Sequence, residues 1–413
     1  MKNNELNKKS YYRKYLAAIG VSLFLLIAIF VFLVNKWQPT PDLASEKIIC
    51  QVSAKQLNKD PNELTDEDFA KIPELNLAYK DISDIKLLEK FTNLQKLSLS
   101  NAKYAENKIP KFVKALAKLR IFDISKRYYI DLEPLANLTK LEYLHLSETQ
   151  IRDIKPLEKL TDLKDLRLSE TQIDDIEPLK NCVNLEMLWL DKTLIKDLKP
   201  LKNCTKLEWL LLNDTKVTDI GPLAGLKNLQ ELDLSHTQIS NIEALKEMTK
   251  LTKLNLYEVS VSDFQPLSSL VNLEELDIGS RYLVDISFLS NLTKLQKLIF
   301  GTSNVKDISP ISSLINLQNL TLRDGNIKDF SALSPLTKLS KLDMFYSNIE
   351  DLRPLEKLIS LKELQLSYTP LSDLKPVKNM KSLEQLHIFN CDNITNDEIE
   401  DLQKARPNLK INY

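Results

Sequence analysis

The chain has little glycine, cysteine and histidine: 6 Gly, 4 Cys and 3 His among 413 residues. It contains no glycine-rich phosphate loop, no Cys-x-x-Cys pair and no His-Glu-x-x-His motif, which are the usual signatures of nucleotide and zinc sites. His145, His236 and His387 lie far apart, and no cysteine stands where one of them would activate it. We therefore expect no enzyme activity, no cofactor, no metal site and no small-molecule substrate.

An excess of charge of either sign is also absent. The 56 Lys and Arg residues balance 57 Asp and Glu residues, so the formal net charge is −1. No stripe of basic residues with interleaved aromatics stands out, although such a stripe is the usual footprint of nucleic-acid binding. We expect no nucleic-acid partner.

Leucine, by contrast, is abundant and recurs at a fixed interval. It occurs every 22 residues from Leu119 to Leu383 without a slip. With that leucine as position 1, positions 4 and 6 are apolar and position 5 is mostly polar, which predicts a short strand with alternating faces. Further apolar residues fall at positions 11, 14, 17 and 20. Each unit can therefore bury one face against its neighbours, and the chain holds fifteen such units and a fragment.

These units resemble a known class of repeat. Residues 141–162 read LEYLHLSETQIRDIKPLEKLTD, which is similar to the 22-residue repeats of bacterial internalin-like leucine-rich-repeat proteins. The resemblance covers residues 46–413 and implies an α/β solenoid: a leucine-rich-repeat horseshoe with a parallel concave β-sheet, short convex 3-10 turns and helical caps. It also implies binding of a macromolecule without specifying which one.

One column departs from that family. The family usually places asparagine at position 9, whereas six units here have threonine: Thr149, Thr171, Thr193, Thr215, Thr237 and Thr369. A buried hydroxyl needs a hydrogen-bond partner, and we expect each threonine to bond turn backbone of the next unit.

Both ends of the solenoid are predicted to be capped by short helices. Thr65 with Asp68, and Thr395 with Glu398, have the spacing of a capping box. The predicted parts are an N-terminal cap (46–71), the leucine-rich repeats (72–382) and a C-terminal repeat with its cap (383–413).

The N-terminal residues predict a membrane anchor. Residues 16–34 carry no charge, and as a helix they would be about 28 Å long, close to the thickness of the hydrocarbon core. The basic tail 1–15 is expected to stay in the cytoplasm, with residues 35–45 as a linker. An uncleaved signal anchor then makes this a single-pass membrane protein whose repeats lie at the cell surface or in the periplasm. A cleaved signal peptide is the alternative.

Position 13 is a column of aspartates, interrupted by Asn241. Such a ladder suggests calcium, but a calcium site needs several oxygens converging on one ion. A short side-chain acceptor here also stabilises the start of a tight helical turn, and proline often follows at position 16. We interpret the column as structural.

The four cysteines do not have the spacing of a disulfide framework. Cys182 and Cys204 occupy position 20 of adjacent units, which is near enough for a bridge. Their side chains are expected to be parallel, which favours two buried thiols over a disulfide.

Aromatic residues at outward positions are the candidates for partner binding. We expect the first group, at strand positions 3 and 5, to be exposed as one apolar patch rimmed by His145, Asp165 and Arg167. A second group lies at positions 7 and 8 near the C-terminal end. The alternative is that these aromatics only pack against one another or under the turn. The candidate residues are Tyr143, Met187, Trp189, Trp209 and Leu211 in the first group, and Phe345, Tyr346, Tyr368 and Phe389 in the second.

These features favour a membrane-anchored extracytoplasmic protein that recognises or adheres to an unidentified protein ligand through its concave face. A second hypothesis is a scaffold or regulatory subunit of a membrane-associated complex, similar to phosphatase-regulating repeat proteins. Asp233, Asp277 and nearby glutamates would allow a carboxylate pair on the inner face, which we interpret as solvated surface.

Overall fold

The structure is a computed structural model that describes residues 43–82, 85–103, 109, 111–127, 131–301, 304–323 and 327–413. The predicted cytoplasmic tail and membrane span, with most of the linker, lie outside these residues. No helix within the described ranges is long and apolar enough to cross a membrane.

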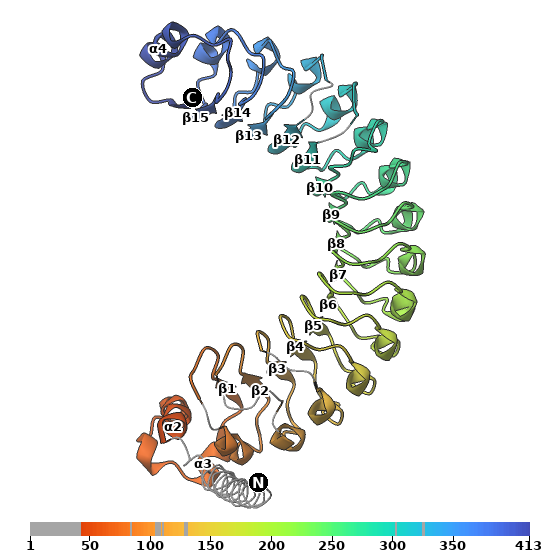
Figure 1. The fold of residues 1–413 in the computed structure, drawn as a ribbon, viewed down its shortest axis with the longest axis vertical. Coiled ribbons are helices and arrows are strands. Elements are labelled where there is room, and N and C mark those ends of the chain that lie inside the picture. The colour runs from red at the N-terminus through yellow and green to blue at the C-terminus, as the bar shows by residue number, and fades with distance from the viewer. Residues whose placement is uncertain are drawn as a thin grey trace, which may run out of the picture.

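Each unit contributes one short strand, and the strands form a single parallel sheet in sequence order (Figure 1). In every strand from β1 to β15 the residue at position 4 is buried. The 16 strands in the described part of the chain correspond to the fifteen units and the fragment, so the predicted repeat number is confirmed. Their bounds are β1 Glu74–Asn76, β2 Lys96–Ser98, β3 Ile121–Asp123, β4 Tyr143–His145, β5 Asp165–Arg167, β6 Met187–Trp189, β7 Trp209–Leu211, β8 Glu231–Asp233, β9 Lys253–Asn255, β10 Glu275–Asp277, β11 Lys297–Gly301, β12 Asn319–Arg323, β13 Lys341–Asp343, β14 Glu363–Gln365, β15 Gln385–His387 and β16 Lys410–Asn412.

The convex side consists of short 3-10 helices, as predicted. They are η2 Lys86–Lys90, η3 Lys111–Ala115, η4 Glu133–Leu135, η5 Lys155–Leu157, η6 Glu177–Leu179, η7 Lys199–Asn203, η8 Gly221–Leu223, η9 Glu243–Glu247, η10 Gln265–Ser269, η11 Ser287–Asn291, η12 Ser309–Ser313, η13 Ser331–Leu333, η14 Arg353–Leu355 and η15 Lys375–Asn379. A further 3-10 helix, η1 Pro61–Glu63, precedes the first strand and belongs to the N-terminal cap. Neighbouring strands lie only about 4.8 Å apart, and the bulkier 3-10 segments need more room, so the sheet lines the inside of an arc (Figure 1).

The aspartate column starts these 3-10 helices. From residue 131 to residue 373, the side-chain oxygen at position 13 accepts a hydrogen bond from the amide two residues later, at 2.7 to 2.9 Å in every unit. Asn241 makes the same bond to Glu243, because an amide oxygen accepts as a carboxylate does. This bond lowers the pKa of Asp307, Asp329 and Asp351 below the ordinary aspartate value. The structural interpretation of the column is confirmed.

The threonine column behaves differently from the prediction. Each hydroxyl donates to the carbonyl oxygen three residues earlier in its own unit, at 2.5 to 2.7 Å, as in Thr193 to Leu190. The residue at position 8 is left-handed, for example Lys192 with φ 53°, and this reverses the chain just after the strand. Position 9 is thereby folded back over position 6, so the expected bond to the next unit is wrong.

The two central cysteines are free and buried, as predicted. Cys182 Sγ lies 3.7 Å from the carbonyl oxygen of Leu160, and Cys204 Sγ lies 3.6 Å from that of Cys182. Burial raises the pKa of Cys182 to about 12 and that of Cys204 to about 11, so both remain thiols at neutral pH.

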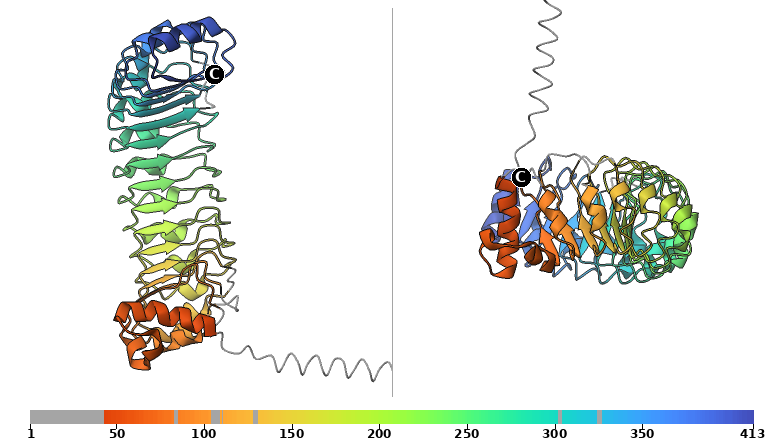
Figure 2. Two further views of the ribbon diagram at one scale, coloured as in Figure 1. Left: turned by 90° about the vertical axis from the view of Figure 1, so that its left-hand side faces the viewer. Right: turned by 90° about the horizontal axis from the view of Figure 1, so that it is seen from below.

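Helices cover both ends of the core (Figure 2). Both predicted capping boxes are present, at the starts of α3 (Asp66–Lys71) and α4 (Asn396–Ala405). The sequence did not reveal α2 (Leu43–Leu57), whose first three residues fall in the predicted linker. Its buried side chains include Ser45 and Ser53, so it lacks the apolar stripe that identifies most surface helices.

Candidate functional site

The side chains at positions 3 and 5 of each strand line the concave face of the sheet, and Figure 2 (left) shows the strands of that face. Strand register places equal positions side by side: Met187 lies beside Trp209, and Trp189 beside Leu211. Tyr143 is separated from Met187 by Asp165. The predicted adjacency of the tryptophan strands is therefore confirmed.

The first aromatic group is less exposed than predicted. Tyr143, Met187, Trp189, Trp209 and Leu211 are all half-buried. Because neighbouring strands lie only about 4.8 Å apart, side chains of adjacent units touch and cover much of each other's surface. What remains accessible is a continuous apolar surface across β6 and β7, which we call the tryptophan patch.

Three polar residues beside the tryptophan patch form an ion-pair cluster. Asp165 is only 7% exposed, and its carboxylate accepts from Arg167 Nη2 at 2.9 Å and lies 3.2 Å from His145 Nε2. Burial raises the pKa of Asp165, but the bonds from His145 and Arg167 outweigh it and hold the pKa below its ordinary value. His145 is thus a hydrogen-bond partner of a buried carboxylate at the rim of the tryptophan patch.

The same cluster positions Trp189. The Arg167 guanidinium lies 4.0 Å from the centre of the Trp189 ring, in a cation–π contact. The same guanidinium is bonded to Asp165, so Arg167 is itself held in place against the ring.

The second aromatic group lies at the turn leaving β13 and β14. The rings of Tyr346 and Tyr368 stack with centroids 4.6 Å apart, and Phe345 meets both edge-on. Tyr346 is 58% exposed and Tyr368 41%, so they do not tuck under the turn. Phe389 lies one unit further on, where its carbonyl accepts from the Tyr368 amide at 2.8 Å. We call these residues the tyrosine cluster.

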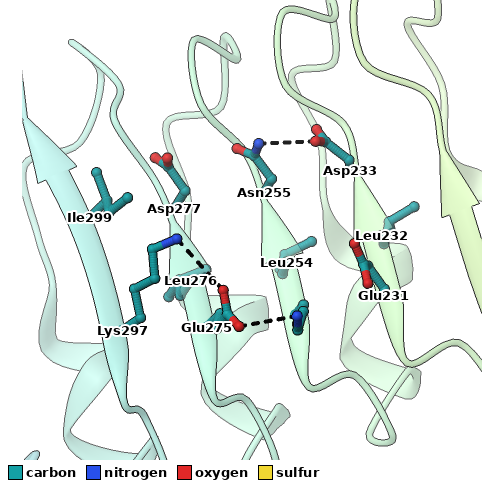
Figure 3. Close-up of a pocket in the computed structure, with 11 residues that line it drawn as sticks. Glu231, Leu232, Asp233, Leu254, Asn255, Glu275, Leu276, Asp277, Lys297 and Ile299 are labelled. Atoms are coloured by element: carbon teal, nitrogen blue, oxygen red, sulfur yellow. Dashed lines mark hydrogen bonds and ion pairs between the residues drawn. The ribbon is translucent and has the colours of Figure 1, made fainter. Parts of the chain in front are cut away.

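The middle of the arc carries a polar groove over β8 to β11 (Figure 3). At position 3, Glu275 lies between Lys253 and Lys297, at 3.1 Å and 3.7 Å. At position 5, Asp233 and Asp277 flank Asn255. The sequence had indicated these carboxylates only as solvated surface, yet both are half-buried.

Asp277 is poorly compensated. It accepts one weak bond, 3.3 Å from the Gly279 amide. Burial raises its pKa above the ordinary value, the nearby Asp233 raises it further, and Lys297 and His236 only partly oppose this. An ionised carboxylate at this place costs the folded chain stability at neutral pH.

We therefore expect Asp277→Asn to stabilise the domain at pH 7. A carboxyl whose folded pKa is raised contributes stability below its unfolded pKa, and that contribution is lost as pH rises through the folded pKa. The amide keeps the Gly279 bond without the charge. Thermal melting should show a rise on the order of 1 °C at pH 7, small because the domain is large, and none at pH 3. An equal shift at both pH values would contradict the electrostatic cause.

Known proteins share this repeat architecture. A family model described as leucine-rich repeats (2 copies) matches residues 139–181, 161–203 and 205–247. The crystal structure of the internalin inlF from Listeria monocytogenes is 28% identical, with a TM-score of 0.68, over 85% of this chain and 98% of that one. The chain therefore has a leucine-rich-repeat fold similar to that of this internalin. No curated protein sequence matches the chain.

Two further structures share the fold of this internalin-like protein. A leucine-rich-repeat protein of Leptospira interrogans has a TM-score of 0.76 at 20% identity, over 84% of this chain and 97% of that one. The functional domain of InlJ from Listeria monocytogenes has a TM-score of 0.73 at 20% identity, over 91% of this chain and 80% of that one. The architecture is that of a protein-interaction scaffold and not of an enzyme.

Proposed function

We propose that this internalin-like protein is held in a membrane by residues 16–34 and displays its repeats outside the cytoplasm, where the concave face binds a protein partner. The tryptophan patch is the observation that carries the proposal. Along most of the sheet, positions 3 and 5 hold charged or polar residues, whereas β6 and β7 place Met187, Trp189, Trp209 and Leu211 together.

Pre-organisation supports the tryptophan patch as the centre of binding. Large aromatic side chains bury much area with few rotatable bonds, and a ring already fixed by Arg167 loses little further freedom when a partner covers it. The tyrosine cluster is the second proposed contact. Tyr346, Tyr368 and Phe389 are more exposed than the first group, and the two tyrosine rings stack on each other.

The Trp189→Ala, Trp209→Ala double variant tests the tryptophan patch. Affinity for a protein captured from envelope or host-cell extract should fall at least about tenfold, because two anchoring rings of the interface are removed. Affinity is measured by surface plasmon resonance with full-length chain, alongside thermal melting. The matched control is Ile315→Ala, Ile359→Ala, which removes two exposed apolar side chains that lie outside the strands. Equal affinity of both variants, with intact melts, would contradict the proposal.

Topology is tested separately by adding protease to intact cells. We expect the repeats to be digested from outside while the tail 1–15 stays protected. If the repeats were protected and became accessible only after lysis, the regulatory-subunit hypothesis would be favoured over surface recognition.

A further inference from the structure

The row of side chains at strand position 5 changes character in the middle of the arc. Backbone register makes Trp189, Leu211, Asp233, Asn255 and Asp277 consecutive neighbours across β6 to β10. The first two side chains of this row are apolar and belong to the tryptophan patch. The next three are polar and include two carboxylates. One extended partner segment lying across these strands would contact both parts of the row.

The two carboxylates have no cation of their own. Asp233 accepts from the Ser235 amide at 2.9 Å, from Ser235 Oγ at 2.7 Å and from Asn255 Nδ2 at 3.1 Å. Asp277 has only its bond from Gly279, and Figure 3 draws no contact from it to another residue of the groove. Within the described ranges neither makes an ion pair, while the two nearby lysines are paired with Glu275.

Two other carboxylates of the concave face receive a cation from the chain itself. Asp165 is paired with Arg167, and Asp343 with Arg323 at 2.5 Å. Arg167 also lies over Trp189, so this face already holds one guanidinium that contacts both a carboxylate and an aromatic ring. Asp233 and Asp277 have no such guanidinium from the described part of the chain.

We propose that Asp233 and Asp277 receive a lysine or arginine side chain of the protein partner, next to an apolar side chain that sits on Trp189 and Leu211. This inference rests on the proposed function and specifies the chemistry of its partner: a basic residue adjacent to an apolar one.

The spacing suits an organic cation. Asp233 and Asp277 are two strands apart, so their backbones are separated by about 10 Å. An ammonium or guanidinium group on a long side chain can lie between two such carboxylates and donate to both. No group of three or more potential metal ligands occurs in the described part of the chain. The raised pKa of Asp277 is consistent with a carboxylate that lacks its counter-charge.

Peptide selection from a random twelve-residue phage library tests this on the full-length chain. Peptides selected on wild type should be enriched in Lys or Arg beside an aromatic or aliphatic residue, and the enrichment should vanish on Asp233→Asn, Asp277→Asn. For one selected peptide, affinity should fall at least tenfold in that double variant. Replacing the basic residue of the peptide by Gln should cause the same loss on wild type and no further loss on the variant.

Asp123→Asn is the matched control. Asp123 also stands at position 5 and accepts from Ser125 N and Oγ at 3.1 Å and 2.7 Å, but its neighbours in the row are Ser98 and His145. This variant should bind the peptide within twofold of wild type. Equal basic content of peptides from wild type and the double variant, or no selectable peptide at all, would overturn the inference.

The tryptophan double variant separates this inference from the proposed function. If it binds the selected peptide normally while the aspartate double variant does not, the tryptophan patch fails and the basic subsite stands. The reverse pattern removes the subsite alone. Thermal melting of each double variant checks that a loss of peptide binding is not caused by unfolding.

Discussion

Leu210→Asn should destabilise the solenoid by about 4 kcal/mol, because it removes a buried aliphatic side chain and leaves an amide without partners in the core. Leu210 is 0% exposed and lies between Leu188 and Leu232 at the same strand position. In a stack of repeats each unit rests only on its neighbours, so the damage should divide the array into two blocks. Denaturant unfolding followed by circular dichroism should lose its single transition.

Leu211→Asn is the control, since it makes the same chemical change one residue later. Leu211 points to the concave face and is half-buried, so the amide remains in contact with water. We expect a loss below about 1 kcal/mol and a single transition. Similar losses for the two variants would mean that strand alternation does not separate core from surface as described.

Arg406→Ala should weaken the C-terminal end by about 3 kcal/mol, because hydrogen bonds from a charged donor are among the stronger ones in proteins. Its guanidinium donates to the carbonyls of Met380 at 2.5 Å, Leu383 at 2.8 Å and Lys381 at 3.2 Å, with a longer bond to Val377 at 3.4 Å. These carbonyls lie in η15 and between η15 and β15, in the last full unit, where they would otherwise lack a hydrogen-bond donor from Arg406. Amide hydrogen exchange should rise in β15 and α4 while the central strands stay protected.

Two variants sharpen that test. Arg406→Lys should recover little, because an ammonium group cannot span several carbonyls as a planar guanidinium does. Lys404→Ala, in the helix α4 that ends just before Arg406, removes only an exposed pair with Glu400 at 3.7 Å and should change exchange very little. Uniformly faster exchange along the whole chain would show that Arg406 does not act locally.

Much of the candidate site could be predicted from periodicity. Once Leu188 and Leu210 are assigned to the core, strand alternation places Trp189 and Trp209 on the opposite face, and the constant repeat length places them on adjacent strands. Their actual exposure could not be predicted, because it depends on how neighbouring side chains cover each ring. Arg167 over Trp189 is such a contact, and no pattern in the sequence indicates it.

The unpaired state of Asp277 was also invisible in the sequence. Charged residues of both signs stand at positions 3 and 5 of neighbouring strands, so the sequence allows an ion pair for each of them. Only the side-chain conformations show that Lys253 and Lys297 turn to Glu275 and leave position 5 without a cation.

The sequence alone determined the leucine-rich-repeat solenoid, its repeat number, its capping boxes and its aspartate turns. Each depends on residues close in the chain or on a repeated interval, so local geometry and burial of one face are sufficient to specify them. Tertiary structure decided which concave residues remain accessible and which carboxylates lack a partner. Those features arise between units. A long polar side chain there can bond to any of several neighbours, and which bond forms depends on how the units pack.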